Sequence, residues 1–175
     1  AASDVYKRQV CTLQRGYDLP TKARRKGEYP LFSANGITDY IDEYKVTAPA
    51  VITGRSGTIG EVHYSESHNW ALNTALYVKY FKGNLPKYIY YFLKSFNLKR
   101  FASGTGVPTL NRNVLSEEKV YINDSTDVQT EQCNQLDNLT DLSLKFSKVQ
   151  NDLISEYNLL KAAILVQELN PSESA

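Results

Sequence analysis

Apolar and polar residues alternate over short stretches in the first two thirds of the chain, and a period of two is typical of β-strands. The clearest alternation covers residues 75–81, where Leu76, Val78 and Tyr80 are expected on one face. Shorter strands are predicted at 10–13, 29–33, 37–41 and 119–122. The period changes to that of a helix at 87–97, directly after Pro86, which is a favourable first residue of a helix.

One stretch, residues 51–64 (VITGRSGTIGEVHY), combines two strand-like runs with three glycines at every third position between them. Glycine permits tight turns and close backbone approach. Arg55 and Ser56 lie in the middle of the turn, and an arginine fork suits phosphates and guanine edges. Two interpretations remain open here: a binding tip that presents Arg55, or a hairpin in which Arg55 pairs with a local carboxylate.

The last third of the chain has a different pattern, with no Gly or Pro from Thr126 to Glu168. Its apolar residues recur at a mean step close to 3.5, the coiled-coil repeat, and Thr126 with Gln129 fits a capping box at the start. About 42 residues give a helix of roughly 60 Å, too long for a small domain to bury. We therefore expect a helix–helix interface formed by Leu139, Leu142, Phe146, Val149, Leu153, Tyr157, Leu160 and Ile164.

These patterns predict an α/β (α+β) chain: a mostly β globule with a few helices, followed by one long C-terminal coiled-coil helix. The expected bounds are 10–124 for the globule, 125–169 for the helix and 170–175 for a tail. Residues 1–9 (AASDVYKRQ) resemble a translated sequencing-adapter read-through, so we set them aside as a non-native segment. The true N-terminus is left open.

Charge is distributed unevenly, although the net charge of the 175 residues is only +1. Residues 1–112 hold 16 Lys and Arg against 8 Asp and Glu, whereas residues 113–175 hold 4 against 11. A basic half suggests contact with nucleic acid, and the acidic helix argues against DNA as the partner of its apolar stripe. Four cations at 22–26 are expected to be exposed, either as a solvated loop or as phosphate contacts.

Several function classes lack their sequence signals. No apolar run approaches the length of a membrane span, and Cys11 and Cys133 form no CxxC pair, so a reducing cytoplasm is the natural expectation. There is no phosphate-loop, GxGxxG, HExxH or GxSxG motif. His63 and His68 could hold a metal, but an ordinary polar face of a hairpin explains them as well. We therefore predict binding without catalysis, and no metal.

A set of motifs occurs in an order that resembles the specificity (S) subunit of type I restriction-modification systems. The motifs are RGYDLP (15–20), GEYP (27–30), SANGI (33–37), GRSGTIG (54–60), Trp70, LNTALYV (72–78) and VPTLNR (107–112). Each is weak alone, and their order and spacing make the resemblance specific over residues 15 to about 165. One departure is that Asn123 and Asp124 stand where the family usually has a proline before the helix.

The resemblance implies one DNA target recognition domain plus the conserved spacer helix. It implies double-stranded DNA, methyltransferase (M) subunits, a restriction/translocase (R) subunit and a second copy or second half as partners, with no membrane. AdoMet, ATP and Mg are then expected on partner subunits and no cofactor in this chain. The chain would be a half subunit that dimerises through its helix, or the C-terminal half of a truncated reading frame. The alternative is a recognition domain cut from a single-chain restriction-methylation enzyme, and a third hypothesis is a coiled-coil assembly protein without a DNA role.

Under the DNA hypothesis, cations hold phosphates while Arg and Asn side chains reach base edges. Asn35 is ambiguous, because it also suits a tight turn. The residues predicted to contact phosphate are Lys22, Arg24, Arg25 and Lys26. Those predicted near bases or backbone are Ser33, Asn35, Arg55, Ser56, Thr105 and Arg112.

Overall fold

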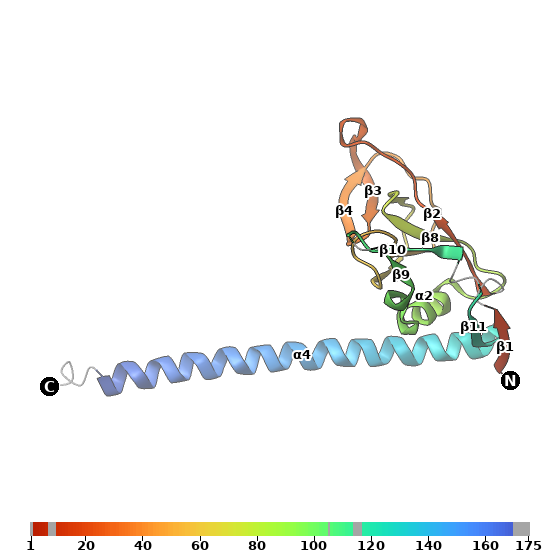
Figure 1. The fold of residues 1–175 in the computed structure, drawn as a ribbon. Helices are drawn as coiled ribbons and strands as arrows, with labels where there is room; N and C mark the ends of the chain where they lie inside the picture. Colours follow the sequence, from red (N-terminus) through yellow and green to blue (C-terminus); the bar gives the residue numbers. More distant parts are fainter. Residues whose placement is uncertain (1, 7–9, 105, 114–116, 170–175) are drawn as a thin grey trace. The chain divides into compact units, whose positions relative to one another are not determined.

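The computed structural model describes residues 2–6, 10–104, 106–113 and 117–169, and the chain divides into two compact units (Figure 1). The first unit is a mostly β globule that ends at Cys133. The second begins at Asn134 and contains the remainder of one long helix. This architecture confirms the predicted class, a mostly β globule with a few helices and a long C-terminal helix.

The larger sheet of the globule has four antiparallel strands in the order β2–β8–β5–β6. Its strands are β2 (Thr12–Arg15), β5 (Ala50–Gly54), β6 (Val62–Ser65) and β8 (Ala75–Tyr80). β5 and β6 form a hairpin in which Val51 pairs with Tyr64, as the flanks of the glycine stretch predicted. β2 starts two residues later than the strand predicted at 10–13. Val10 and Cys11, which precede it, are buried in the core.

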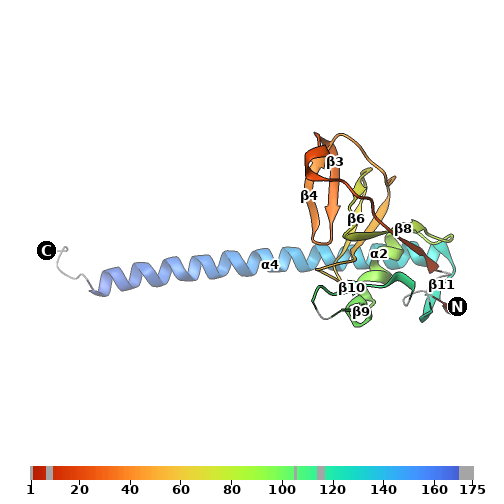
Figure 2. The ribbon, with the colours of Figure 1, turned by 45° about the horizontal axis from the view of Figure 1, so that its top comes forward.

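The smaller sheet has three strands in the order β4–β3–β7. They are β3 (Lys26–Ser33), β4 (Gly36–Ile41) and β7 (Trp70–Ala71). β3 and β4 form the long hairpin drawn in orange in Figure 2, and its turn at Ala34-Asn35 contains the residue expected to suit a tight turn. β7 pairs with β3 in parallel, placing Trp70 beside Leu31. Both side chains are buried, so the single tryptophan is a packing residue.

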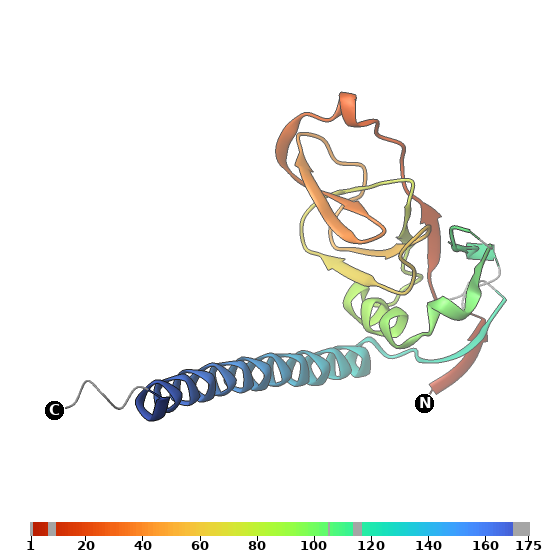
Figure 3. The same cartoon turned by 60° about the vertical axis from the view of Figure 1, so that its left-hand side comes forward.

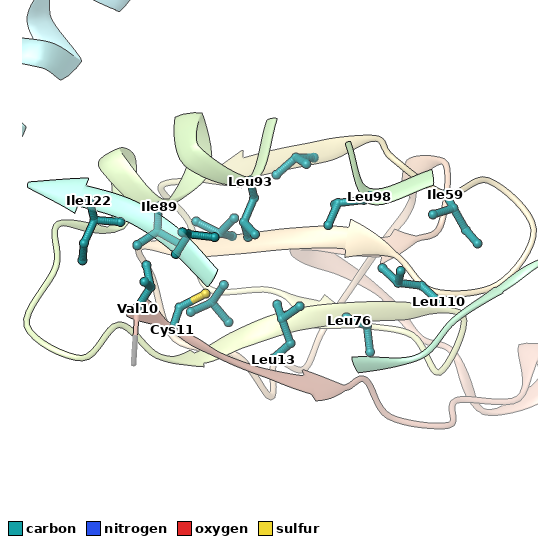
Figure 4. Packing of buried hydrophobic residues seen from close by; sticks show 14 residues of the cluster. Val10, Cys11, Leu13, Ile59, Leu76, Ile89, Leu93, Leu98, Leu110 and Ile122 are labelled. Atoms are coloured by element: carbon teal, nitrogen blue, oxygen red, sulfur yellow. The ribbon is translucent and has the colours of Figure 1, made fainter. Parts of the chain in front are cut away.

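The larger sheet is covered on both faces, which explains its continuous apolar runs. Helix α2 (Pro86–Ser95) lies on one face, as the cartoon in Figure 3 shows. Its Ile89 and Leu93 belong to the same buried cluster as Val51 and Leu76, and Figure 4 labels Ile89, Leu93 and Leu76. Neighbouring positions in the same strands point the other way, toward the smaller sheet. There Ile52, Ala75 and Tyr77 pack against Phe32 and Ala71.

The prediction for β8 was therefore incomplete. Leu76 and Val78 do share a face, but Ala75 and Tyr77 between them are equally buried. Tyr80, expected with Leu76 and Val78, is 53% exposed because the strand ends there.

Short elements complete the globule. They are η1 (Thr21–Ala23), η2 (Leu98–Phe101), β9 (Ala102–Ser103), β10 (Thr109–Leu110), β11 (Lys119–Asn123) and β1 (Ala2–Tyr6). β1 pairs antiparallel with β11, from Ala2 opposite Asn123 to Tyr6 opposite Lys119. The pairing includes residues 2–6 of the segment that the sequence marks as non-native. Pairing with a strand edge needs only extended backbone, because main-chain groups make the hydrogen bonds.

The long helix α4 (Thr126–Leu169) confirms the predicted element, but its cap is Ser125 and not Thr126. The Ser125 Oγ accepts the Val128 N–H at 3.5 Å. Gln129, the expected partner in the capping box, is fully buried in the globule, and so is Cys133 one turn later. The proposed capping box of Thr126 and Gln129 is therefore wrong, because the cap lies one residue earlier and the Gln129 side chain bonds to other partners. Within the described part of the chain, α4 and α2 are both too polar or too short to span a membrane.

Candidate nucleic-acid interface

The glycine-rich loop after β5 folds tightly, with its main chain in close contact with itself. A Cβ built on Gly54 would stand 1.7 Å from the Thr58 carbonyl oxygen, so only glycine fits there. Gly57, at the tip of the loop, has φ +86°, in the region that favours glycine. The loop thereby reverses within a few residues and leaves Arg55 and Ser56 half-buried at its rim.

Main-chain hydrogen bonds join this loop to the segment around β10, fifty residues later. The Leu110 N–H donates to the Arg55 carbonyl at 2.7 Å, and the Gly57 N–H donates to the Pro108 carbonyl at 3.1 Å. Ser56 and Thr109 form a β-bridge. Three of the predicted contact residues, Arg55, Ser56 and Arg112, are therefore brought to one edge of the globule.

A pocket of about 340 Å³ opens between these segments. Among the described residues, those that line it include arginines and residues with hydroxyl or amide side chains, and no Asp or Glu. The lining residues are Arg15, Arg55, Leu76, Ser103, Thr109, Leu110, Asn111, Arg112 and Asn113. A cavity with this lining attracts anions.

Arg15 is an arginine of this lining that sequence reasoning did not select, whereas Arg55 and Arg112 were predicted contacts. It lies at the end of β2, ninety-seven positions before Arg112, so its place beside Arg55 depends on sheet order. The sequence feature that could have pointed to Arg15 is its position as the first residue of the RGYDLP motif.

Arg55 also has a structural role. Its Nη1 donates to the Asn73 carbonyl at 3.1 Å, and the main-chain N–H groups of Arg55 and Ser56 both donate to the Thr74 carbonyl. The expected pairing with a local carboxylate is not what holds Arg55. Since a guanidinium has five N–H donors, this anchor leaves others for the pocket.

Ser33 and Asn35 lie on the β3–β4 turn. The Ser33 Oγ donates to the Gly36 carbonyl at 3.4 Å and accepts the Asn35 N–H at 3.2 Å, so this hydroxyl serves the turn itself. Asn35 is exposed. The turn lies next to the glycine loop, because a Cβ on Gly54 would also stand 3.0 Å from the Ala34 carbonyl oxygen.

The four cations at 22–26 form a separate patch. Lys22, Arg25 and Lys26 are exposed, whereas the Arg24 guanidinium donates twice to the Leu19 carbonyl at 3.3 Å. β3 begins at Lys26 and ends at the turn, so the patch is separated from Asn35 by roughly 20 Å of strand at ~3.3 Å per residue. Thr105, also predicted near DNA, lies outside the described residues.

The predicted stripe on α4 is exposed along its whole length. Exposed fractions of its eight side chains range from 50% at Ile164 to 68% at Phe146. Ile154, which the stripe did not include, joins Leu153, Tyr157 and Leu160 along a shallow apolar groove on the helix. Exposed apolar area on this scale is typical of an interaction surface.

Two titratable groups of the globule are shifted by burial. Partial burial lowers the pKa of His63 below its ordinary 6.5, and the nearby charge of Glu61 opposes this only in part. Burial also raises the pKa of Tyr77, with a further contribution from its hydrogen bond to the Tyr17 hydroxyl at 2.9 Å. Both shifts arise from packing. No three His, Cys, Asp or Glu side chains gather as a metal site among the residues described.

The chain was compared with known proteins. The family described as type I restriction modification DNA specificity domain matches residues 7–156. The EcoprrI type I restriction enzyme specificity subunit of Escherichia coli is 28% identical over 95 residues, which are 54% of this chain and 24% of that protein.

Three solved structures share the fold at low sequence identity. The S subunit of a type I system from M. genitalium gives a TM-score of 0.71 at 16% identity, covering 99% of this chain and 47% of the other. The HsdS subunit of Thermoanaerobacter tengcongensis gives 0.70 at 13%, covering 95% and 44%. A structure concerned with complex assembly and conformational transition of the type I R-M system gives 0.79 at 14%, covering 95% and 45%. The chain thus spans less than half the length of each of these relatives.

Proposed function

This chain belongs to the family of type I restriction-modification DNA specificity domains, and from that premise we propose that its globule recognises one half of a bipartite DNA site. A domain of this family recognises DNA and is not catalytic. Side chains around the glycine loop and the neighbouring β3–β4 turn would contact bases or the DNA backbone, and further cations of the globule would hold phosphates.

The observation that carries this proposal is the junction between the glycine loop and the β10 segment. It gathers Arg55, Ser56 and Arg112 at one edge, next to the turn that carries Asn35. The amide of Asn35 suits an adenine edge, and guanidinium groups suit either a guanine edge or a backbone phosphate. The excess of cations in the first 112 residues supplies the attraction to DNA that does not depend on sequence.

The long helix supplies the assembly part of the function. Its apolar stripe packs against the equivalent helix of a second copy or second half, which would bury side chains that are 50–68% exposed. The globule and helix together dock the methyltransferase subunits, and the restriction/translocase subunit joins them. AdoMet, ATP and Mg²⁺ act on those partners and not on this chain. Such an assembly works on cellular DNA, so the location is the cytoplasm.

Two measurements test the recognition proposal: selection of bound duplexes from a random-sequence DNA library, and the salt dependence of DNA affinity. The full chain is equilibrated with a library of random duplexes, bound molecules are sequenced, and affinity is measured from low to high salt. We expect one short motif to be enriched. Six phosphate contacts would give a log–log slope of about −5.

Two results would contradict the proposal. Binding without enrichment would limit the chain to non-specific DNA attachment. No binding, or binding that salt does not weaken, would favour the coiled-coil assembly hypothesis.

A further inference from the structure

The guanidiniums of Arg15 and Arg55 are linked through two residues on separate loops, Asp18 and Asn73. Arg15 Nη2 lies 3.4 and 3.5 Å from the two carboxylate oxygens of Asp18. The side-chain amide of Asn73 donates to the same carboxylate. The main-chain carbonyl of Asn73 accepts the bond from Arg55. Asp18 and Asn73 thus connect Arg15 to Arg55 without lining the pocket themselves.

The loop that carries Asn73 is itself fixed on both sides. The Thr74 carbonyl accepts the main-chain N–H groups of Arg55 and Ser56 at 2.9 and 3.1 Å. On the other side, the Tyr17 N–H donates to the Ala71 carbonyl at 2.8 Å. An arginine already held in one rotamer loses less conformational entropy when a ligand binds.

The lining favours a phosphate over a base edge. A guanine edge offers two acceptors in one plane, and a single arginine fork satisfies both. A phosphate offers oxygens in several directions, which suits two or more guanidiniums together with the hydroxyls of Ser103 and Thr109. The pocket volume, about 340 Å³, accommodates a phosphodiester group.

We propose that the pocket between Arg15, Arg55 and Arg112 binds one phosphodiester of the DNA backbone, with Asp18 and Asn73 as the positioning residues of its guanidiniums. This inference rests on the proposed DNA recognition and adds the chemical role of one site to it. The phosphate contact fixes the globule on the duplex and does not itself read sequence.

This site is tested by measuring how the full chain binds a mixed-sequence 30-base-pair duplex. Fluorescence anisotropy gives the affinity at each concentration of a salt series. Arg15→Gln should weaken binding about tenfold near 0.1 M salt and reduce the salt slope by about one. Lys94→Gln is the matched control, because it removes one exposed cation from α2 and should leave the slope unchanged. The sequence enriched from the random library should be the same for Arg15→Gln and the unchanged protein.

Asp18→Ala separates positioning from simple charge. Removing a carboxylate makes the globule more positive, so an effect of charge alone would tighten DNA binding. Loss of positioning should instead weaken binding about threefold, which is less than the roughly tenfold or more expected for losing a whole charged hydrogen bond. Asp18 is 69% exposed at its side chain, so thermal unfolding should show that the variant stays folded.

The outcomes distinguish the two proposals. If the unchanged protein does not bind duplex DNA, the proposed function fails. If it binds with a steep slope but Arg15→Gln alters neither affinity nor slope, the phosphate site is wrong while DNA recognition stands. An altered enriched sequence would make Arg15 a base-reading residue, and tighter binding by Asp18→Ala would remove the positioning role.

Discussion

The side-chain amide of Gln129, in the first turn of α4, donates to the Asn84 Oδ1 across 2.6 Å. The same nitrogen donates to the Asn123 carbonyl at 2.7 Å, and the Gln129 Oε1 accepts the Leu85 N–H at 2.9 Å. Leu85 caps α2 and has no side-chain acceptor of its own. One buried side chain from α4 therefore completes the start of another helix.

Replacing Gln129 by leucine should strongly destabilise the globule. The substitution keeps the volume but leaves the Leu85 N–H and the Asn123 carbonyl unpaired in the interior, at a cost of about 2–4 kcal/mol. Chemical denaturation of the globule measures this loss. Gln132→Leu, on the exposed side of the same helix, is the control and should change stability by about 0.5 kcal/mol at most. Equal effects of the two substitutions would contradict the role of this network.

Alanine at Gly54 should destabilise the globule because the new methyl group would overlap the Thr58 carbonyl oxygen. Backbone must move to make room, so we expect a loss of about 2 kcal/mol or more. Gly106→Ala is the matched control, since a Cβ there meets nothing within 4 Å and its φ is not positive. Thermal unfolding of the two variants checks the contrast, and a neutral Gly54→Ala would show that the loop relaxes freely.

Aspartate at Leu153 should abolish self-association through α4. Leu153 lies at the centre of the exposed stripe and is 66% exposed, so the substitution leaves the helix itself largely unaffected. A charge buried in a helix–helix interface is strongly unfavourable. Sedimentation velocity should show the loss of the larger species. Ser155→Asp introduces the same charge off the stripe and should leave the sedimentation coefficient unchanged. An unaltered coefficient for Leu153→Asp would contradict the coiled-coil assignment.

The globule should lose stability as the pH falls below about 6.5, the ordinary pKa of histidine. Burial lowers the pKa of His63 in the folded state, so the unfolded chain binds a proton more readily. Stability from this group is therefore complete above pH 6.5 and decreases as the pH falls toward the folded-state pKa. The free energy of unfolding, measured between pH 7.5 and 5.5, should fall less steeply in His63→Gln than in the unchanged protein. Identical slopes for the two proteins would contradict a lowered pKa of His63 in the folded state.

The pattern of apolar residues predicted most of the secondary structure, because strand and helix periods are local properties of the chain. It placed the β5–β6 hairpin, the β3–β4 turn, α2 and the full length of α4 close to their observed positions. It misplaced the cap of α4, because Ser125 and Thr126 are both good cap residues. It also assigned the Gln129 side chain to the cap, whereas in the structure this side chain donates to the Asn84 Oδ1.

The amino-acid sequence by itself determined the fold class, the uneven charge and the resemblance to S subunits, since composition, period and motif order can all be read along one dimension. Only the tertiary structure decided which of the candidate residues act together. Arg15, Arg55 and Arg112 share a pocket because β2, β5 and β10 meet there, while the cations at 22–26 lie at the far end of β3. Such neighbours depend on sheet order and register, which are set by packing between distant segments and leave no local pattern in the chain.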